Sequence, residues 1–217
     1  MSDRPQDPQT FPAAAVAAGA PATAVPEPRA TSSVATDVAL VSTFAAFIAV
    51  CAILPGIPTP TGVPITLQTF AVILSGLVLG WRRGGLAALL YVAVGLAGLP
   101  VFSGGAGGLD VLAGPSVGYL LAFPLAAAVA GLLAGGTALV PPSQRYLTLF
   151  AAGLLASLMT IHPLGILGMM WRLELTFAEA VAADAVFIPG DVVKNLVAAL
   201  VAVTVFRAFP ELLRSRR

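Results

Sequence analysis

The sequence predicts an all-α integral membrane protein with six transmembrane helices and both termini in the cytoplasm. Three observations lead to this fold class. The 217-residue chain is 58% hydrophobic and 10% charged, with a mean hydropathy of +0.96, whereas a soluble domain carries about 25% charged residues. Charged residues are absent from long stretches such as 38–81 and 111–144. The basic residues gather at alternate connections between the apolar stretches.

Pro/Gly-rich stretches divide the apolar blocks into segments near the length of about 20 residues that a spanning helix needs. "LPGIPTPTGVP" separates the first span from the second, "VFSGGAGGLDVLAGPS" precedes the fourth, and "VPPSQR" ends it. The stretch "WRLELTFAEAVAAD" is more polar, and we expect a short interfacial helix there. The predicted spans cover residues 36–55, 64–81, 84–100, 117–139, 146–170 and 185–208.

The chain divides into three parts. Residues 1–34 are rich in Pro, Ala and Thr and read as a disordered cytoplasmic tail, because repeated Pro breaks helices. This tail lacks the leucine-rich core of a signal peptide. Residues 35–210 form the membrane domain, and residues 211–217 form a basic cytoplasmic tail.

Arginine placement predicts the orientation, because positive residues mark the cytoplasmic side. The loops at 55–64, 100–117 and 171–185 are expected outside the cell membrane, since they contain Arg172 as their one basic residue. The basic residues of the loops after the second and fourth spans and of the C-terminal end, all predicted to be cytoplasmic, are Arg82, Arg83, Arg145, Arg207, Arg214, Arg216 and Arg217.

The sixth span contains Asp191 and Lys194, and Lys194 is the only lysine of the chain. A charge at the centre of a membrane helix costs about 2.5–3.5 kcal/mol on insertion scales, and such residues mark functional sites. A spacing of three puts both side chains on one helical face. Two interpretations stay open: a polar ligand site that opens outward, or an Asp191 helix cap neutralised by Lys194.

The predicted outer loops offer further ligand contacts. The backbone of "SGGAGG", which includes Ser103, Gly104 and Gly105, can approach a ligand closely because glycine has no side chain. The alternative is a flexible turn. Tyr119 begins the fourth span near the outer face, where it is either a ligand contact or an interfacial aromatic residue.

Composition argues against several other classes of protein. The net charge of +1 gives no reason to expect a nucleic-acid partner, and one histidine and one cysteine cannot form a metal cluster. We therefore expect no metal, no cofactor and no enzymatic activity. A membrane enzyme built on Ser157, Thr160 and His162 remains an alternative. The fifth span, however, contains no acidic residue to orient the imidazole, and His162 fits a packing or turn role.

Three stretches together resemble the BioY family, the biotin-binding S components of energy-coupling factor (ECF) transporters. They are "PITLQTFAVILSGLVLGWRRGGLAALLYVAVGLAGLPVFSGG", "GPSVGYLLAFPLAAAVAG" and "FIPGDVVKNLVAAL", and the resemblance runs from about residue 38 to 205. It implies a six-helix protein of the lipid bilayer that captures biotin at its outer face. It also implies a transmembrane T component and two ATP-binding subunits as partners, with toppling in the bilayer to release the vitamin.

The resemblance also implies roles for residues. The "PGDxxK" motif falls on Asp191, which would accept from a ureido N–H, and on Lys194, which would donate to a ligand oxygen. The loop of Ser103, Gly104 and Gly105 would close over the bicyclic rings. Tyr119 matches the tyrosine of the family's "GPTGGY". This chain reads "GPSVGY", with Ser116 and Val117 in place of Thr and Gly, so the loop before Tyr119 need not follow the family's path.

Small residues spaced by four on the family's first helix meet the T component, and close packing of small residues is a sound physical reason. This chain offers the pairs Ser42/Ala46 and Ala45/Ala49. Two alternatives keep the fold. The protein is an S component for another vitamin, or it transports biotin without ATPase partners. No GxxxxGK[ST] motif occurs in this chain, so the chain itself cannot hydrolyse ATP by that route.

Overall fold

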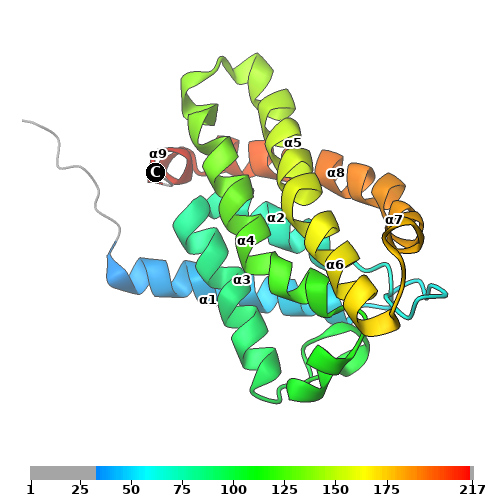
Figure 1. Ribbon diagram of the computed structural model, residues 1–217. Helices are drawn as coiled ribbons and strands as arrows, with labels where there is room; N and C mark the ends of the chain where they lie inside the picture. Colours follow the sequence, from blue (N-terminus) through cyan, green and yellow to red (C-terminus); the bar gives the residue numbers. More distant parts are fainter. Residues whose placement is uncertain (1–32, 216–217) are drawn as a thin grey trace, which may run out of the picture. The chain divides into compact units, whose positions relative to one another are not determined.

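The computed structural model describes residues 33–215, which form one helical unit (Figure 1). The predicted disordered tail lies outside the described residues except for Ser33 and Val34, which cap and begin the first helix. Within the described part of the chain, β pairing is limited to an isolated bridge between Ile57 and Ile65. The α-helices are α1 Val34–Ile53, α2 Gln68–Leu79, α3 Trp81–Leu96, α4 Val117–Leu133, α5 Arg145–Ala156, α6 His162–Leu173, α7 Phe177–Ala185, α8 Ile188–Ala208 and α9 Pro210–Ser215.

Four helical stretches are long and apolar enough to cross a membrane: Val34–Ile53, Val117–Leu139, Pro142–Leu173 and Ile188–Ala208. They correspond to the predicted first, fourth, fifth and sixth spans. The second of them joins α4 to the 3₁₀ turn Ala134–Leu139, and the third joins α5 to α6. The prediction of an all-α membrane protein with several apolar helices is therefore confirmed.

The helix of the predicted second span is shorter than expected, and the helix of the predicted third span begins and ends earlier in the chain. Helix α2 has 12 residues and α3 has 16, which correspond to about 18 Å and 24 Å at 1.5 Å per residue. The predicted second span began at residue 64, but the chain turns back between Ile57 and Ile65, which pair in the isolated bridge, and α2 begins at Gln68. Pro58, Pro60 and Pro64 in this segment cannot continue a helix.

Helix α2 lies at the centre of the unit and packs against α1, α3, α4, α5 and α8. Ten of its twelve residues are buried. Glycines permit the close approach, because a Cβ built on Gly84 of α3 would lie 2.7 Å from the Cα of Gly76. Small residues at helix crossings are the usual means of packing in membranes, where lipid supplies no hydrophobic drive between helices.

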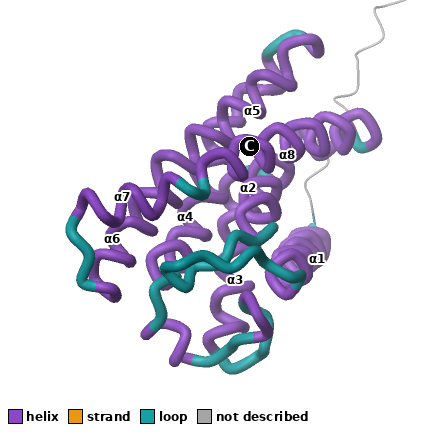
Figure 2. The backbone as a smooth tube through the Cα atoms, turned by 90° about the vertical axis from the view of Figure 1, so that its right-hand side faces the viewer, coloured by secondary structure: helices purple, strands orange, loops and turns teal. Residues whose placement is uncertain are grey.

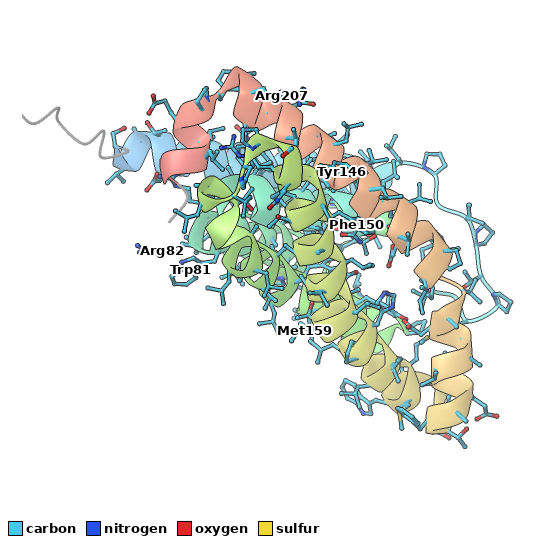
Figure 3. The ribbon with its side chains drawn as sticks, turned by 90° about the horizontal axis from the view of Figure 1, so that it is seen from above. Trp81, Arg82, Tyr146, Phe150, Met159 and Arg207 are labelled. Carbon is cyan, nitrogen blue, oxygen red and sulfur yellow. The ribbon has the colours of Figure 1, made fainter. Side chains whose placement is uncertain are left out.

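A π-helical turn, Ser157–Ile161, connects α5 to α6 without ending the helical rod. The backbone N–H of His162 donates to Ser157 O, five residues earlier. Pro163 follows and has no N–H to offer the preceding turn, which gives the regular helix a physical reason to break here. The turn faces Thr160 and Ile161 inward and leaves Met159 65% exposed (Figure 3).

The polar stretch after α6 forms a helix, as predicted, and α7 begins with a capping box. The Thr176 hydroxyl accepts from Glu179 N, and the Glu179 carboxylate accepts from Thr176 N. The predicted C-terminal tail differs, because residues Pro210–Ser215 form α9. Pro210 suits the first helical position, and Leu213 is buried.

The two long loops, 54–67 and 97–116, lie together at one end of the helical unit, where both line the same cavity. The connection from α1 to α2 crosses in front of the helices in Figure 2. Basic residues lie at the other ends of the same helices: Arg82 and Arg83 follow the C-terminus of α2, Arg145 follows α4 and its 3₁₀ turn, and Arg207 lies in the last turn of α8. Arg82 points outward beside Trp81 (Figure 3), with its guanidinium carbon 5.9 Å from the ring centre.

Candidate ligand-binding site

A cavity of about 410 Å³ lies among the loops and the helix ends. Its wall comes from the end of α1 and the following loop, the starts of α2, α4 and α8, and the glycine-rich turns after α3. Most of the lining is apolar, including Phe102, Phe123 and Phe187. The polar side chains on the wall are those of Thr66, Gln68, Thr69, Ser103, Ser116, Tyr119, Asp191 and Lys194.

The ion pair of Asp191 and Lys194 forms the charged part of this wall. Lys194 Nζ lies 2.8 Å from Asp191 Oδ1, which confirms that both side chains occupy one face of α8. Thr69 of α2 completes a triangle. Its hydroxyl donates to Asp191 Oδ1 over 3.0 Å and accepts from Lys194 Nζ over 3.1 Å.

Asp191 does not cap the helix that contains it. Helix α8 begins at Ile188, its N-cap residue is Phe187, and no side chain caps it. The Asp191 carboxylate lies one turn further on and is directed to Lys194 and Thr69. The alternative interpretation of Asp191 as a capping residue is therefore wrong, because its oxygens bind side chains rather than the orphan N–H groups.

Two further ionisable residues lie directly behind the wall. His162 and Asp184 are 5% and 3% exposed and do not line the cavity. Tyr119 donates its hydroxyl to Asp184 Oδ1 over 2.7 Å, and His162 Nδ1 lies 2.8 Å from Asp184 Oδ2. The other ring nitrogen of His162 lies 3.5 Å from Asp191 Oδ2. Together with Thr69 of α2, residues from α4, α6, α7 and α8 thus form one continuous polar cluster.

Local sequence explains how these groups meet. The π turn rotates the start of α6 so that His162 points into the unit. The capping box holds the start of α7, and Asp184 lies two turns later on its buried side. Tyr119 lies beside the crossing of α4 and α6, where a Cβ built on Gly168 would lie 2.6 Å from Gly118 N.

A second set of polar contacts, centred on Gln68, supports the cavity wall. Gln68 lines the cavity, and its side-chain amide donates to the Tyr91 hydroxyl over 2.6 Å. Thr66 donates to the Gln68 carbonyl oxygen over 3.1 Å. The Tyr91 ring meets Phe102 edge to face, with ring centres 5.5 Å apart. These bonds fix the Gln68 amide before any ligand enters.

The structure brings most of the predicted site residues together. Asp191, Lys194, Tyr119, Ser103 and Gly104 line the cavity, whereas Gly105 is exposed and outside the lining. The turns take the irregular path expected of the glycine loop, with a φ of 71° at Gly104 and 75° at Gly105.

Sequence reasoning did not include Thr69, Gln68, His162 and Asp184 in the site. A signal for two of them was present, because "TLQT" places polar side chains at the start of an otherwise apolar span. Asp184 and His162 gave no such signal, since their partners lie on other helices.

The His162 imidazole has an acidic partner, contrary to expectation. The fifth span indeed contains no acidic residue, but Asp184 of α7 orients the His162 imidazole. The triad alternative still lacks its nucleophile. The Ser157 hydroxyl is fully buried and has no hydrogen-bond partner within the described residues, and Thr160 donates to Ala156 O. A catalytic serine needs a hydrogen bond to its base.

The small residues predicted to meet a partner divide between two environments. Ser42 and Ala46 are exposed on α1. Ala45 is 7% exposed and belongs to the core, and Ala49 is half-buried against it. Residues four apart lie on the same face of a helix. The pair Ala45/Ala49 therefore faces the protein's own helices, and the pair Ser42/Ala46 lies on a different, exposed face.

The chain is similar in sequence to known transport proteins. The profile of the BioY family matches residues 12–211, and so extends into the predicted tail. The chain is 40% identical over 193 residues to the biotin transporter BioY of Rhodobacter capsulatus, covering 83% of this chain and 98% of that protein. It is 39% identical to the probable biotin transporter BioY of Pyrococcus horikoshii, covering 75% of this chain and 93% of that protein.

The fold is also similar to a solved structure. The crystal structure of the S-component for biotin from an ECF-type ABC transporter matches with a TM-score of 0.73 and 26% identity. The match covers 80% of this chain and 92% of that one. By its sequence and by its fold, the chain belongs to the BioY family.

Proposed function

We propose that this protein captures biotin from outside the cell as the substrate-binding S component of an ECF-type vitamin uptake transporter. The observation that carries the proposal is the ion pair of Asp191 and Lys194 on the wall of a largely apolar cavity. The family and the relatives named as biotin transporters support the choice of vitamin.

The chemistry of the cavity suits biotin. A volume of about 410 Å³ falls within the range of about 300–1,000 Å³ that small-molecule sites occupy. Phe102, Phe123 and Phe187 supply apolar surface for a sulfur-containing bicycle and an aliphatic chain. Asp191 accepts from a ureido N–H, and Lys194 donates to an oxygen of the ligand. The turns around Ser103 and Gly104 close over the rings.

The proposed orientation places the cavity on the outer side of the cell membrane. Arg82, Arg83, Arg145 and Arg207 lie at the helix ends remote from the cavity, and positive residues favour the cytoplasm. Six spans follow if the shorter α2 and α3 also cross the bilayer. Helix α2 can do so because other helices surround it, and both termini then lie inside.

The proposed partners are a transmembrane T component and two ATP-binding subunits. Ser42 and Ala46 on the exposed face of α1 offer a surface where another helix can pack closely. Ala45 and Ala49 support α1 from within the unit and contribute to this surface only indirectly.

The test is binding of labelled biotin to purified protein in detergent. Asp191→Asn and Lys194→Met variants of matched thermal stability should lose binding, and Thr204→Val on the exposed side of α8 is the matched control. Folded wild type that binds another vitamin but not biotin would reassign the ligand. If both variants bind biotin as tightly as wild type, Asp191 and Lys194 do not contact the ligand. If cells without T and ATP-binding subunits still take up biotin through this protein, it does not need these partners.

A further inference from the structure

The proposed site leaves two buried ionisable residues without a role. His162 and Asp184 lie behind the cavity wall, and their side chains are 6% and 4% exposed. A buried charge is expensive unless it is paired. Both residues bind groups that do line the cavity, namely Tyr119 and Asp191, so their state affects the wall that a ligand meets.

The hydrogen bonds of Asp184 decide where His162 carries a proton. A carboxylate only accepts hydrogen bonds. Its Oδ1 accepts from the Tyr119 hydroxyl, and its Oδ2 lies 2.8 Å from His162 Nδ1. His162 Nδ1 is therefore protonated in the arrangement that satisfies Asp184.

The second ring nitrogen faces another carboxylate. His162 Nε2 lies 3.5 Å from Asp191 Oδ2. In a neutral ring protonated at Nδ1, the lone pair of Nε2 would point at this negative oxygen. In the imidazolium, an N–H points at each of the two carboxylates. The geometry favours the charged ring because attraction replaces repulsion at 3.5 Å.

The net charge of the cluster also favours the imidazolium form of His162. The titratable or charged groups around the ring are Asp184 on α7, Asp191 and Lys194 on α8, and Tyr119 on α4. Two carboxylates and one ammonium leave one negative charge in a dry environment. An imidazolium balances the cluster to zero, and a low dielectric strengthens that preference.

We infer that His162 is held as an imidazolium between Asp184 and Asp191, and that it is a positioning residue for ligand binding. The charged ring holds one oxygen of Asp191, so the other oxygen stays directed to Lys194, Thr69 and the cavity. The consequence for biotin rests on the proposed function. When His162 loses its proton, Asp191 loses this partner and binds Lys194 more tightly, so the affinity for biotin falls as the pH rises.

The first experiment needs no mutation, because His162 is the only histidine of the chain. Protein labelled with ¹⁵N-histidine and prepared without a histidine tag gives ring nitrogen signals from this residue alone. The two nitrogen shifts distinguish the imidazolium from both neutral tautomers. We expect both nitrogens to be protonated at neutral pH in the ligand-free protein. A neutral ring in folded protein would overturn the inference.

The second experiment measures the dissociation constant for biotin from about pH 5.5 to about pH 9, the range in which histidine titrates. Wild-type affinity should fall with the same midpoint as the ¹⁵N titration. His162→Gln should bind roughly ten- to hundred-fold more weakly, the loss seen in metal sites when a residue that orients a ligating side chain is removed. Its affinity should not follow the titration of an imidazole. Equal pH profiles in both proteins would overturn the positioning role.

A matched control is Thr160→Val, which removes a buried hydroxyl two residues away that donates only to Ala156 O. It should behave as wild type in both experiments. The two proposals fail separately. Biotin binding with a neutral ring overturns the charge assignment alone. An imidazolium in a protein that binds no biotin at any pH overturns the proposed function and the role of the ring in binding.

Discussion

The hydroxyl of Tyr119 donates to Asp184 over 2.7 Å, although the two residues are 65 positions apart. The hydroxyl is thus already engaged by the protein, and the Tyr119 ring lies against Phe187, with ring centres 5.6 Å apart. Tyr119 therefore meets a ligand through its ring, while its hydroxyl keeps a buried carboxylate hydrogen-bonded.

This division of roles predicts how Tyr119→Phe behaves. The ring remains, so the affinity for biotin should fall less than ten-fold, a change of less than about 1.4 kcal/mol. Asp184 loses a donor, which should cost about 1–3 kcal/mol of stability. Thermal unfolding in detergent and biotin titration measure the two effects. Tyr146→Phe is the control, because Tyr146 is outside the cavity lining. A loss of binding beyond a hundred-fold at unchanged stability would assign the hydroxyl to the ligand.

Lys194 can be tested by its reactivity, because it is the only lysine in the chain. Its ammonium lines the cavity. Biotin should slow modification of Lys194 by an amine-directed reagent several-fold, because the ligand covers the ammonium. The α-amino group of the same chain is the internal reference and should react at an unchanged rate. Mass spectrometry of the modified peptides measures both. Equal reaction of Lys194 with and without saturating biotin would contradict the contact.

Gly165 leaves the space that the Tyr119 ring occupies. A Cβ added at Gly165 would overlap the ring, and the ring cannot retreat because Phe187 and Asp184 hold it. Gly165→Ala should therefore lose about 1–3 kcal/mol of stability, as overpacking does, and should bind biotin more weakly. Gly136→Ala is the control, since its added Cβ meets open space. Wild-type melting and binding in Gly165→Ala would show that the ring moves freely.

The capping box of α7 should make the start of this helix sensitive to pH. Hydrogen bonds from the Thr176 hydroxyl and backbone hold the pKa of Glu179 below its usual value. The carboxylate thus stabilises the helix start above its ordinary pKa, and this contribution disappears as the pH falls through the lowered pKa. Amide exchange over 177–185, corrected for intrinsic rates, should accelerate in acid.

Thr176→Ala removes the two hydrogen bonds of the hydroxyl and keeps the one from the Thr176 backbone N–H. It should accelerate exchange in α7 at neutral pH and reduce the acid-dependent step. Thr148→Ala is the control, because the Thr148 hydroxyl donates only to a backbone carbonyl within its own helix start. An unchanged acid step in Thr176→Ala would show that another group is responsible.

The accuracy of the sequence predictions follows from the range of the interactions behind them. The apolar stretches that became α1, α4 and α8 were predictable, because each must match the bilayer along its own length. The segment before α2 that shortens this helix was not, since its bridge joins Ile57 to Ile65 across a turn. Proline marked this segment as irregular but could not say where the helix would begin.

The candidate site shows the same distinction. Helical periodicity alone puts Asp191 and Lys194 on one face, and the structure places them 2.8 Å apart. The cluster behind them depends on contacts between helices: His162 reaches Asp184 from 22 positions away, and Thr69 reaches Asp191 from 122 positions away. No local pattern contains such distances.

Hydropathy, motif order and helical spacing are properties of neighbouring residues, so they were enough to predict an all-α membrane protein, the family resemblance and a charged pair on the last long helix. The packing of the helices was needed to show that Asp191 binds side chains and does not cap its helix, that Ala45 faces the core, and that His162 lies between two carboxylates. These are consequences of how helices pack, since burying a charge requires partners that the packed helices must bring to it.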